Sequence, residues 1–321
     1  MTNQISISTQ VPFDQGNKRL DQVAAQLFPD YSRSRLQQWI KDGQLTVDGK
    51  LWRGRDKLTG GETLALEAEL SPEGDWLPEA MDLDIVYEDD HILVLNKQAD
   101  LVVHPAAGNR EGTLLNGLLH HCPELANIPR AGIVHRLDKD TTGLMVVAKT
   151  LQAQAHLVAQ LQDRTMGREY EAVVQGYMTG GGKVDEPIGR HGTQRTRMAV
   201  NPVGKDAVTH YRVLHKFPTH THIRCKLETG RTHQIRVHMT HIGHPLVGDA
   251  TYAARTRLTK GIGSSLRSLL QSFPRQALHA KALGLLHPVE QEWMEWEVDL
   301  PDDIIELLEM LEEDRRDAHN R

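Results

Sequence analysis

An aspartate between two cations is the group in this sequence best suited to chemistry. Asp138 lies in the polar segment 135–143 (HRLDKDTTG), and the apolar runs 133–134 and 144–148 predict a strand on either side. Nearby cations favour the charged form of a carboxylate, and an ionised, immobile aspartate can act as a nucleophile or a general base. From this loop alone, an ordinary turn with side chains bonded to its own backbone is the favoured interpretation.

The same segment resembles the signature loop of the RluA-type pseudouridine synthases, which isomerise uridine in RNA. The family pattern is HRLD followed by a Thr-Thr-Gly or Thr-Ser-Gly step, as in residues 135–143. The resemblance implies that Asp138 is catalytic and that His135 and Arg136 bind the substrate. Arg136 is expected to fill the gap that a flipped base leaves.

Three further motifs follow in the family's order. REYEAVVQG (168–176) resembles a strand whose tyrosine lies against the target base, which implies a catalytic Tyr170 that could also move the C5 proton; on pattern alone, this tyrosine belongs to the core. GRTHQIRVH (230–238) implies that Arg231 is catalytic and pairs with the catalytic aspartate, and RQALHA (275–280) implies that Leu278 covers the active site.

The first part of the chain has the pattern of a small RNA-binding module. Apolar residues at helical spacing predict helices near 20–27 and 32–42, and a hairpin with an Asp48-Gly49 turn and a closing strand at 63–66 follow. Residues 31–58 contain seven Lys or Arg and three acidic residues, a density that suits phosphate contacts, with a solvated basic face as the alternative. The module resembles the S4 RNA-binding domain, which implies RNA contacts from Arg19, Ser32, Arg33, Arg35, Lys41 and Lys50.

The net charge of −6 conceals a basic body. Residues 62–90 carry 11 acidic residues without a Lys or Arg, and residues 290–321 carry 13 acidic residues and three Arg. The rest of the chain has 34 basic and 19 acidic residues, so a polyanion such as RNA meets a positive local field.

The remaining composition indicates a cytoplasmic protein. No apolar run reaches the roughly 18 residues of a membrane span, and the N-terminus lacks a secretion signal pattern. Two cysteines, Cys122 and Cys225, give neither a disulfide framework nor a cysteine-based zinc site. We therefore expect no membrane partner, and we expect a monomer.

Neither a cofactor nor a metal is expected. Isomerising uridine needs no redox step or group donor, and the chain lacks a nucleotide-binding glycine loop. His233, His238, His241 and His244 could suggest a metal, but no helical His-Glu-x-x-His is present, so polar histidines lining a phosphate-facing groove are the better interpretation.

We predict an α+β fold in which a small S4 domain precedes a mixed, mainly antiparallel β-sheet catalytic domain with flanking helices. The predicted boundaries are 17–70 for the S4 domain, 71–80 for a linker, 81–310 for the catalytic domain and 311–321 for a charged tail.

The predicted function is pseudouridine synthesis in large-subunit (23S) ribosomal RNA or its assembly intermediates. An S4 module before this signature loop resembles family members that modify the stem-loop near the decoding region, helix 69. The alternatives are a synthase acting on tRNA, and a non-catalytic S4-type RNA-binding or ribosome-assembly protein. A glycoside hydrolase would need a second carboxylate about 5 to 10 Å from the first, and Asp140 gives no assurance of that geometry.

Overall fold

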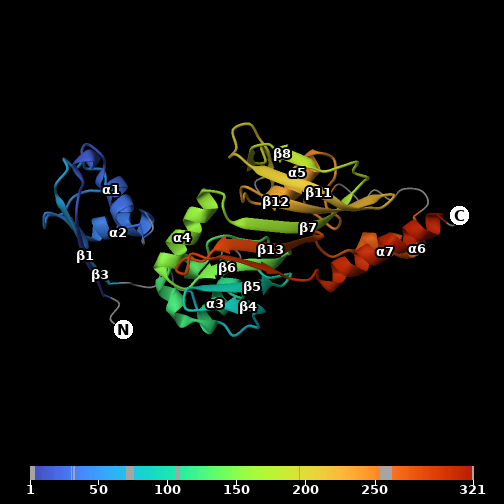
Figure 1. Ribbon diagram of the computed structural model, residues 1–321, viewed down its shortest axis with the longest axis horizontal. Coiled ribbons are helices and arrows are strands. Elements are labelled where there is room, and N and C mark those ends of the chain that lie inside the picture. Colours follow the sequence, from blue (N-terminus) through green and yellow to red (C-terminus); the bar gives the residue numbers. More distant parts are fainter. Residues whose placement is uncertain are drawn as a thin grey trace.

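The computed structural model describes residues 4–29, 31, 33–69, 76–105, 109–194, 196–253 and 262–319. Figure 1 shows a small module at one end, a larger domain built on a twisted sheet, and two helices at the opposite end. The predicted α+β fold with a mixed, mainly antiparallel sheet is confirmed. No helix in the described ranges is long and apolar enough to cross a bilayer.

The N-terminal module packs two helices against a sheet with strand order β1-β3-β2. Its apolar positions recur at helical spacing, so Leu20, Val23, Leu36 and Ile40 all lie in one buried core. The elements are β1 (Gln4–Gln10), α1 (Leu20–Leu27), α2 (Arg33–Asp42), β2 (Leu45–Val47) and β3 (Thr63–Glu69), with a short 3-10 turn η1 (Phe13–Gln15).

The module differs from the sequence prediction in two places. The predicted Asp48-Gly49 turn is present, since Val47 and Lys50 form an antiparallel bridge across it, but no strand follows it and β2 pairs with β3 instead. Strand β1 precedes residue 17 and pairs antiparallel with β3. Ser32 and residues 71–75 of the expected linker lie outside the described residues.

The larger domain is organised by a sheet with strand order β4-β5-β6-β13-β7-β12-β11-β8, and β14 pairs with β13. Strands β6 and β13 run parallel, which brings the end of the signature loop beside the last motif. The strands are β4 (Ile85–Glu88), β5 (Ile92–Lys97), β6 (Thr142–Ala148), β7 (Gly167–Gln175), β8 (Gly182–Asp185), β11 (Val208–Lys216), β12 (His220–Leu227), β13 (Leu278–Leu286) and β14 (Trp293–Glu297). A separate ribbon pairs β9 (Ile188–Arg190) with β10 (Met198–Val200).

Both faces of the central strands are buried. Alternate residues of a strand point to opposite faces, so Met145 and Val147 join the core around Tyr170, whereas Leu144 and Val146 join a second core under α4. The helices are α3 (Leu114–His121), α4 (Leu151–Gln162), α5 (Gln234–His241), α6 (Ser264–Ser272) and α7 (Asp302–His319), with 3-10 turns η2 (Pro123–Asn127) and η3 (Pro129–Gly132).

The expected tail is helical. Helix α7 continues to His319, so the prediction of a frayed end after Asp314 is wrong. Leu307 and Leu311 are buried against α6, and Glu312 forms ion pairs with Arg315 and Arg316 one turn on. Apolar packing and these ion pairs therefore stabilise a helix within the acidic segment.

Candidate active site

The loop carrying Asp138 leads into β6, and a buried lysine fixes its backbone by hydrogen bonds. Lys97 is 1% exposed, and its ammonium donates to the carbonyls of Gln98, Leu101 and Lys139 at 2.7, 3.0 and 2.8 Å. Burial lowers the pKa of Lys97 to about 8. These bonds join the end of β5 to the residue that follows Asp138.

Two further contacts fix the flanks of the loop. Arg275 donates to the carbonyl of Asp140 at 3.0 Å and is paired with Asp303 of α7. The ring of His135 accepts a hydrogen bond from the backbone of Val146 at 3.1 Å. Burial, with a contribution from the charge of Arg168, lowers the pKa of His135 to about 3, so this ring is neutral.

The Asp138 carboxylate is paired with Arg236 at 2.9 Å. The same guanidinium makes two hydrogen bonds, of 2.7 and 2.9 Å, to the buried carboxylate of Asp249. Burial alone would lower the pKa of Arg236, but Asp249 and Asp138 outweigh it and the pKa is raised. Arg236 thus holds the Asp138 carboxylate in a defined orientation while Asp249 holds Arg236.

The prediction that Arg231 pairs with Asp138 is wrong. Arg231 lies ahead of α5 and donates its Nε hydrogen to the carbonyl of Asp206 at 2.9 Å. Arg236 lies within the first turns of α5, which point it toward the signature loop. The motif GRTHQIRVH contains both arginines, and a linear pattern gives no sign of which one the helix directs at the aspartate.

A histidine that the sequence analysis left without a catalytic role is the second group facing Asp138. His233 Nε2 lies 3.7 Å from Asp138 Oδ1, and its Nδ1 shares a hydrogen bond of 2.7 Å with the Tyr252 hydroxyl. That hydroxyl also accepts a hydrogen bond from the backbone of Met198 at 2.9 Å, so Tyr252 holds the His233 ring beside Asp138. The φ of 57° at His233 is a left-handed backbone conformation at this site.

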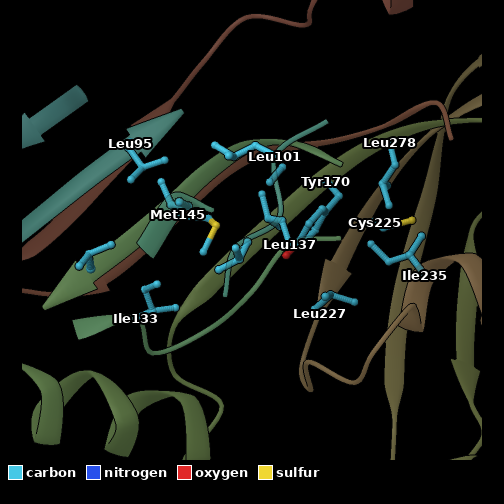
Figure 2. Close-up of a cluster of buried hydrophobic side chains, with 14 of the residues drawn as sticks. Leu95, Leu101, Ile133, Leu137, Met145, Tyr170, Cys225, Leu227, Ile235 and Leu278 are labelled. Carbon is cyan, nitrogen blue, oxygen red and sulfur yellow. The ribbon is translucent and has the colours of Figure 1, made fainter. Parts of the chain in front are cut away.

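A cavity of about 880 Å³ joins the predicted site residues. Asp138, Tyr170 and Leu278 line it, together with Arg231 and Arg236. Figure 2 shows Leu137, Tyr170 and Leu278 converging from three separate segments. Tyr170 is 7% exposed, and burial raises the pKa of its phenol, with Asp138 adding to the effect and Arg168 opposing it.

The other predicted substrate residues also lie at this cavity. His135 and Arg136 line it, and Arg136 is exposed at the mouth. Because the cavity combines a fixed carboxylate, an aromatic wall and an apolar cover, it can take a planar base with its sugar next to the carboxylate.

The histidines expected to line a groove are not equivalent. His238 is fully buried and bonded to Thr209 and to the Glu186 carbonyl, so it faces no groove. Within the described ranges, no group of three or more His, Cys, Asp or Glu side chains could hold a metal ion.

The basic side chains of the N-terminal module are organised by one buried acid. Asp21 is 1% exposed and accepts hydrogen bonds from Arg19, Arg33 and Gln37. Burial opposes ionisation of Asp21, but these bonds lower its pKa. The ion pairs hold two exposed guanidinium groups in place on one surface of the module.

Arg35 differs from the other predicted RNA contacts. It is 8% exposed, and its guanidinium donates to the carbonyl of Asn127 at 3.0 Å. Asn127 belongs to the larger domain, so Arg35 joins the two domains, and its burial argues against the predicted RNA contact. Lys41 and Lys50 are exposed.

Comparison with known proteins points in one direction. Residues 91–241 match the sequence family described as RNA pseudouridylate synthase, and residues 18–64 match the S4 domain. The ribosomal large subunit pseudouridine synthase D of Pseudomonas aeruginosa is 60% identical over 98% of each chain. The protein of that name from Escherichia coli O157:H7 is 56% identical over 98% of this chain and 97% of its own.

Two solved structures also match most of the chain. Human RNA pseudouridylate synthase domain containing 4 superposes with a TM-score of 0.56 at 27% identity, covering 71% of this chain and 92% of its own. Human RNA pseudouridylate synthase domain containing 1 gives a TM-score of 0.52 at 26% identity, covering 72% and 95%.

Proposed function

Because the chain belongs to the RNA pseudouridylate synthase family, we propose that it converts uridines of large-subunit ribosomal RNA to pseudouridine. The observation that carries the proposal is the Asp138–Arg236 pair in a cavity walled by Tyr170. Nearly full-length similarity to enzymes named for the large ribosomal subunit supports the choice of RNA. We assign the stem-loop near the decoding region, helix 69, as the target.

The reaction breaks the N1–C1′ bond of uridine, turns the base and joins C5 to C1′. We assign Asp138 as the group that either attacks the sugar or removes its C2′ proton. Arg236 holds one carboxylate oxygen of Asp138 in place, and His233 Nε2 lies 3.7 Å from the other oxygen.

Tyr170 and Leu278 would enclose the base between an aromatic face and an aliphatic side chain. A flipped base needs a flat, rigid surface, and both residues are almost fully buried. We therefore assign Tyr170 to stacking on the base.

The RNA would be gripped at two places. Arg136 lies at the cavity mouth, where it can occupy the gap that the flipped base leaves in the RNA stack. Unstacking the base costs a few kcal/mol, and filling the gap offsets part of that cost. Arg19, Arg33, Lys41 and Lys50 are exposed on the N-terminal module and suit phosphate contacts. We propose that the protein acts as a cytoplasmic monomer on ribosomal RNA or its assembly intermediates.

The deciding experiment measures tritium release from C5-tritiated fragments of large-subunit rRNA, with tRNA as the comparison substrate. The wild-type protein should release tritium from the rRNA fragment containing the stem-loop. Asp138→Asn, which keeps the shape but removes the charge, should abolish release while RNA affinity stays within a few-fold.

Three results would count against the proposal. Release from tRNA alone would overturn the choice of RNA. Full activity of Asp138→Asn would remove the catalytic assignment, and binding without turnover by the wild-type protein would favour a non-catalytic RNA-binding role.

A further inference from the structure

Arg168 is a buried cation with an unusual lack of ion pairs among the described residues. It is 5% exposed, and in the described part of the chain no carboxylate is in ion-pair contact with it. Its Nη2 donates weakly to the Glu228 carbonyl at 3.3 Å, and its Nε is buried without a hydrogen-bond partner. Burying an unpaired charge is costly, so a folded protein that keeps one there has a use for the charge.

The Arg168 side chain forms part of the cavity wall. Arg168 lies two residues before Tyr170 on β7, and alternate strand residues share a face, so the guanidinium lies beside the phenol. Both side chains line the cavity that contains Asp138. A Cβ at Gly230 would come within 2.6 Å of Arg168 Nη1, so the glycine leaves room for the guanidinium.

We propose that Arg168 is a further catalytic residue, which donates hydrogen bonds to a carbonyl oxygen of the flipped uracil and stabilises the negative charge that the base acquires. This inference rests on the proposed function. When N1–C1′ breaks, its electron pair passes to N1 and spreads onto the carbonyl oxygens, while Asp138 bonds C1′ or takes the C2′ proton. When C5 bonds C1′, that step on the sugar reverses; C5 then loses its proton and N1 gains one, so no co-reactant is needed.

The burial of Arg168 favours the base over an RNA phosphate. Phosphates are charged throughout the reaction and keep contact with water, which suits the exposed Arg130, Arg136 and Arg164 around the cavity. A charge that appears only as the glycosidic bond breaks is best stabilised by a fixed donor in a site from which water is excluded. Arg168, beside the aromatic wall, meets that condition.

The test compares Arg168→Gln, Arg168→Lys and wild type in single-turnover assays on the rRNA fragment, with RNA affinity and melting temperature measured in parallel. Arg267→Gln, an exposed position on α6, is the control. Arg168→Gln should slow conversion by about 100-fold, the scale of a lost charge-stabilising donor, and Arg168→Lys should lose less. RNA affinity should stay within threefold.

Two further measurements separate this role from a structural one. Loss of an unpaired buried charge should leave the melting temperature of Arg168→Gln unchanged or raise it. A second fragment carries 5-fluorouridine at the target, a base that leaves more easily as an anion, and the reaction rate is measured as the disappearance of 5-fluorouridine. On this fragment, the rate of Arg168→Gln should be closer to that of the wild type. If Arg168→Gln does not fold, Arg168→Lys is compared on the two substrates instead.

Four outcomes are decisive. An unchanged rate for Arg168→Gln would overturn the inference, and so would weakened RNA affinity with a normal rate at saturation, which marks a phosphate contact. A lower melting temperature with equal deficits on both substrates would mark a structural role and overturn it as well. A wild-type protein that makes no pseudouridine would instead overturn the proposed function.

Discussion

At the scale of single residues, the site depends on how one guanidinium is shared. Arg236 contacts Asp138 with one nitrogen and Asp249 with two. Lysine is a point charge and cannot make the same forked contact with two carboxylates. The planar fork therefore explains why an arginine, rather than any cation, stands next to Asp138.

Replacing Arg236 tests this arrangement directly. Arg236→Lys should lower the single-turnover rate at least about tenfold, because the ammonium cannot hold both carboxylates. Arg236→Met leaves the Asp249 carboxylate buried without its partner and should cost about 3–5 kcal/mol of unfolding free energy, measured by urea denaturation.

Arg231→Lys is the matched comparison for the rate. The lysine keeps a positive charge at the cavity wall, and the Arg231 that it replaces donates to the Asp206 carbonyl rather than to Asp138. A larger loss from Arg231→Lys than from Arg236→Lys would contradict the pairing seen in the structure.

At the scale of elements, the loop carrying Asp138 is positioned by the parallel pairing of β6 and β13. Gly143 has a φ of 112°, and a Cβ there would lie 2.3 Å from the Ala280 carbonyl oxygen. The strands can approach this closely because the residue has no side chain. The loop ends where that contact begins, so Asp138 and Leu278 are brought to the same cavity.

Adding a methyl group at Gly143 should therefore lower both the stability of the fold and the turnover rate. Gly143→Ala is expected to destabilise the fold by about 2 kcal/mol or more and to lower the turnover rate, since the φ and the contact are both unfavourable for alanine. Gly180→Ala, where a Cβ would meet no atom within 4 Å, is the control. Equal melting temperatures of the two variants would show that the close approach is not required.

At the scale of the whole molecule, buried neutral histidines couple stability to pH. Burial lowers the pKa of His135 to about 3 and those of His220 and His279 to about 4. Between these values and the ordinary pKa near 6.5, the unfolded chain binds protons that the folded chain does not. Stability is therefore complete above about pH 6.5 and falls as the pH drops toward 4.

Urea unfolding at about pH 7 and about pH 5 checks this expectation. Each such histidine contributes up to about 1.4 kcal/mol of lost stability per pH unit in that window. His220→Gln should show a smaller loss between the two conditions than the wild type. Equal unfolding midpoints of the wild type at both pH values would rule the coupling out.

Sequence periodicity and the signature segment determined most of the architecture. The order of the two domains and the helices of the module followed from apolar spacing, because burial of one face imposes that spacing on a sequence. Asp138 was also singled out by a segment whose residues are adjacent in the chain, and β7 was expected from the strand-like run 168–174. Short strands such as β8 and β9 carry too few residues for a periodic signal.

The tertiary structure alone decided which distant side chains meet. Two arginines five residues apart fit the same motif, and the rotation of α5 selected Arg236 for Asp138. Docking between domains turned Arg35 from an expected RNA contact into a buried link, and packing on α6 made the expected tail helical. A sequence pattern encodes periodicity along the chain, whereas the direction of each side chain is fixed when the elements pack together.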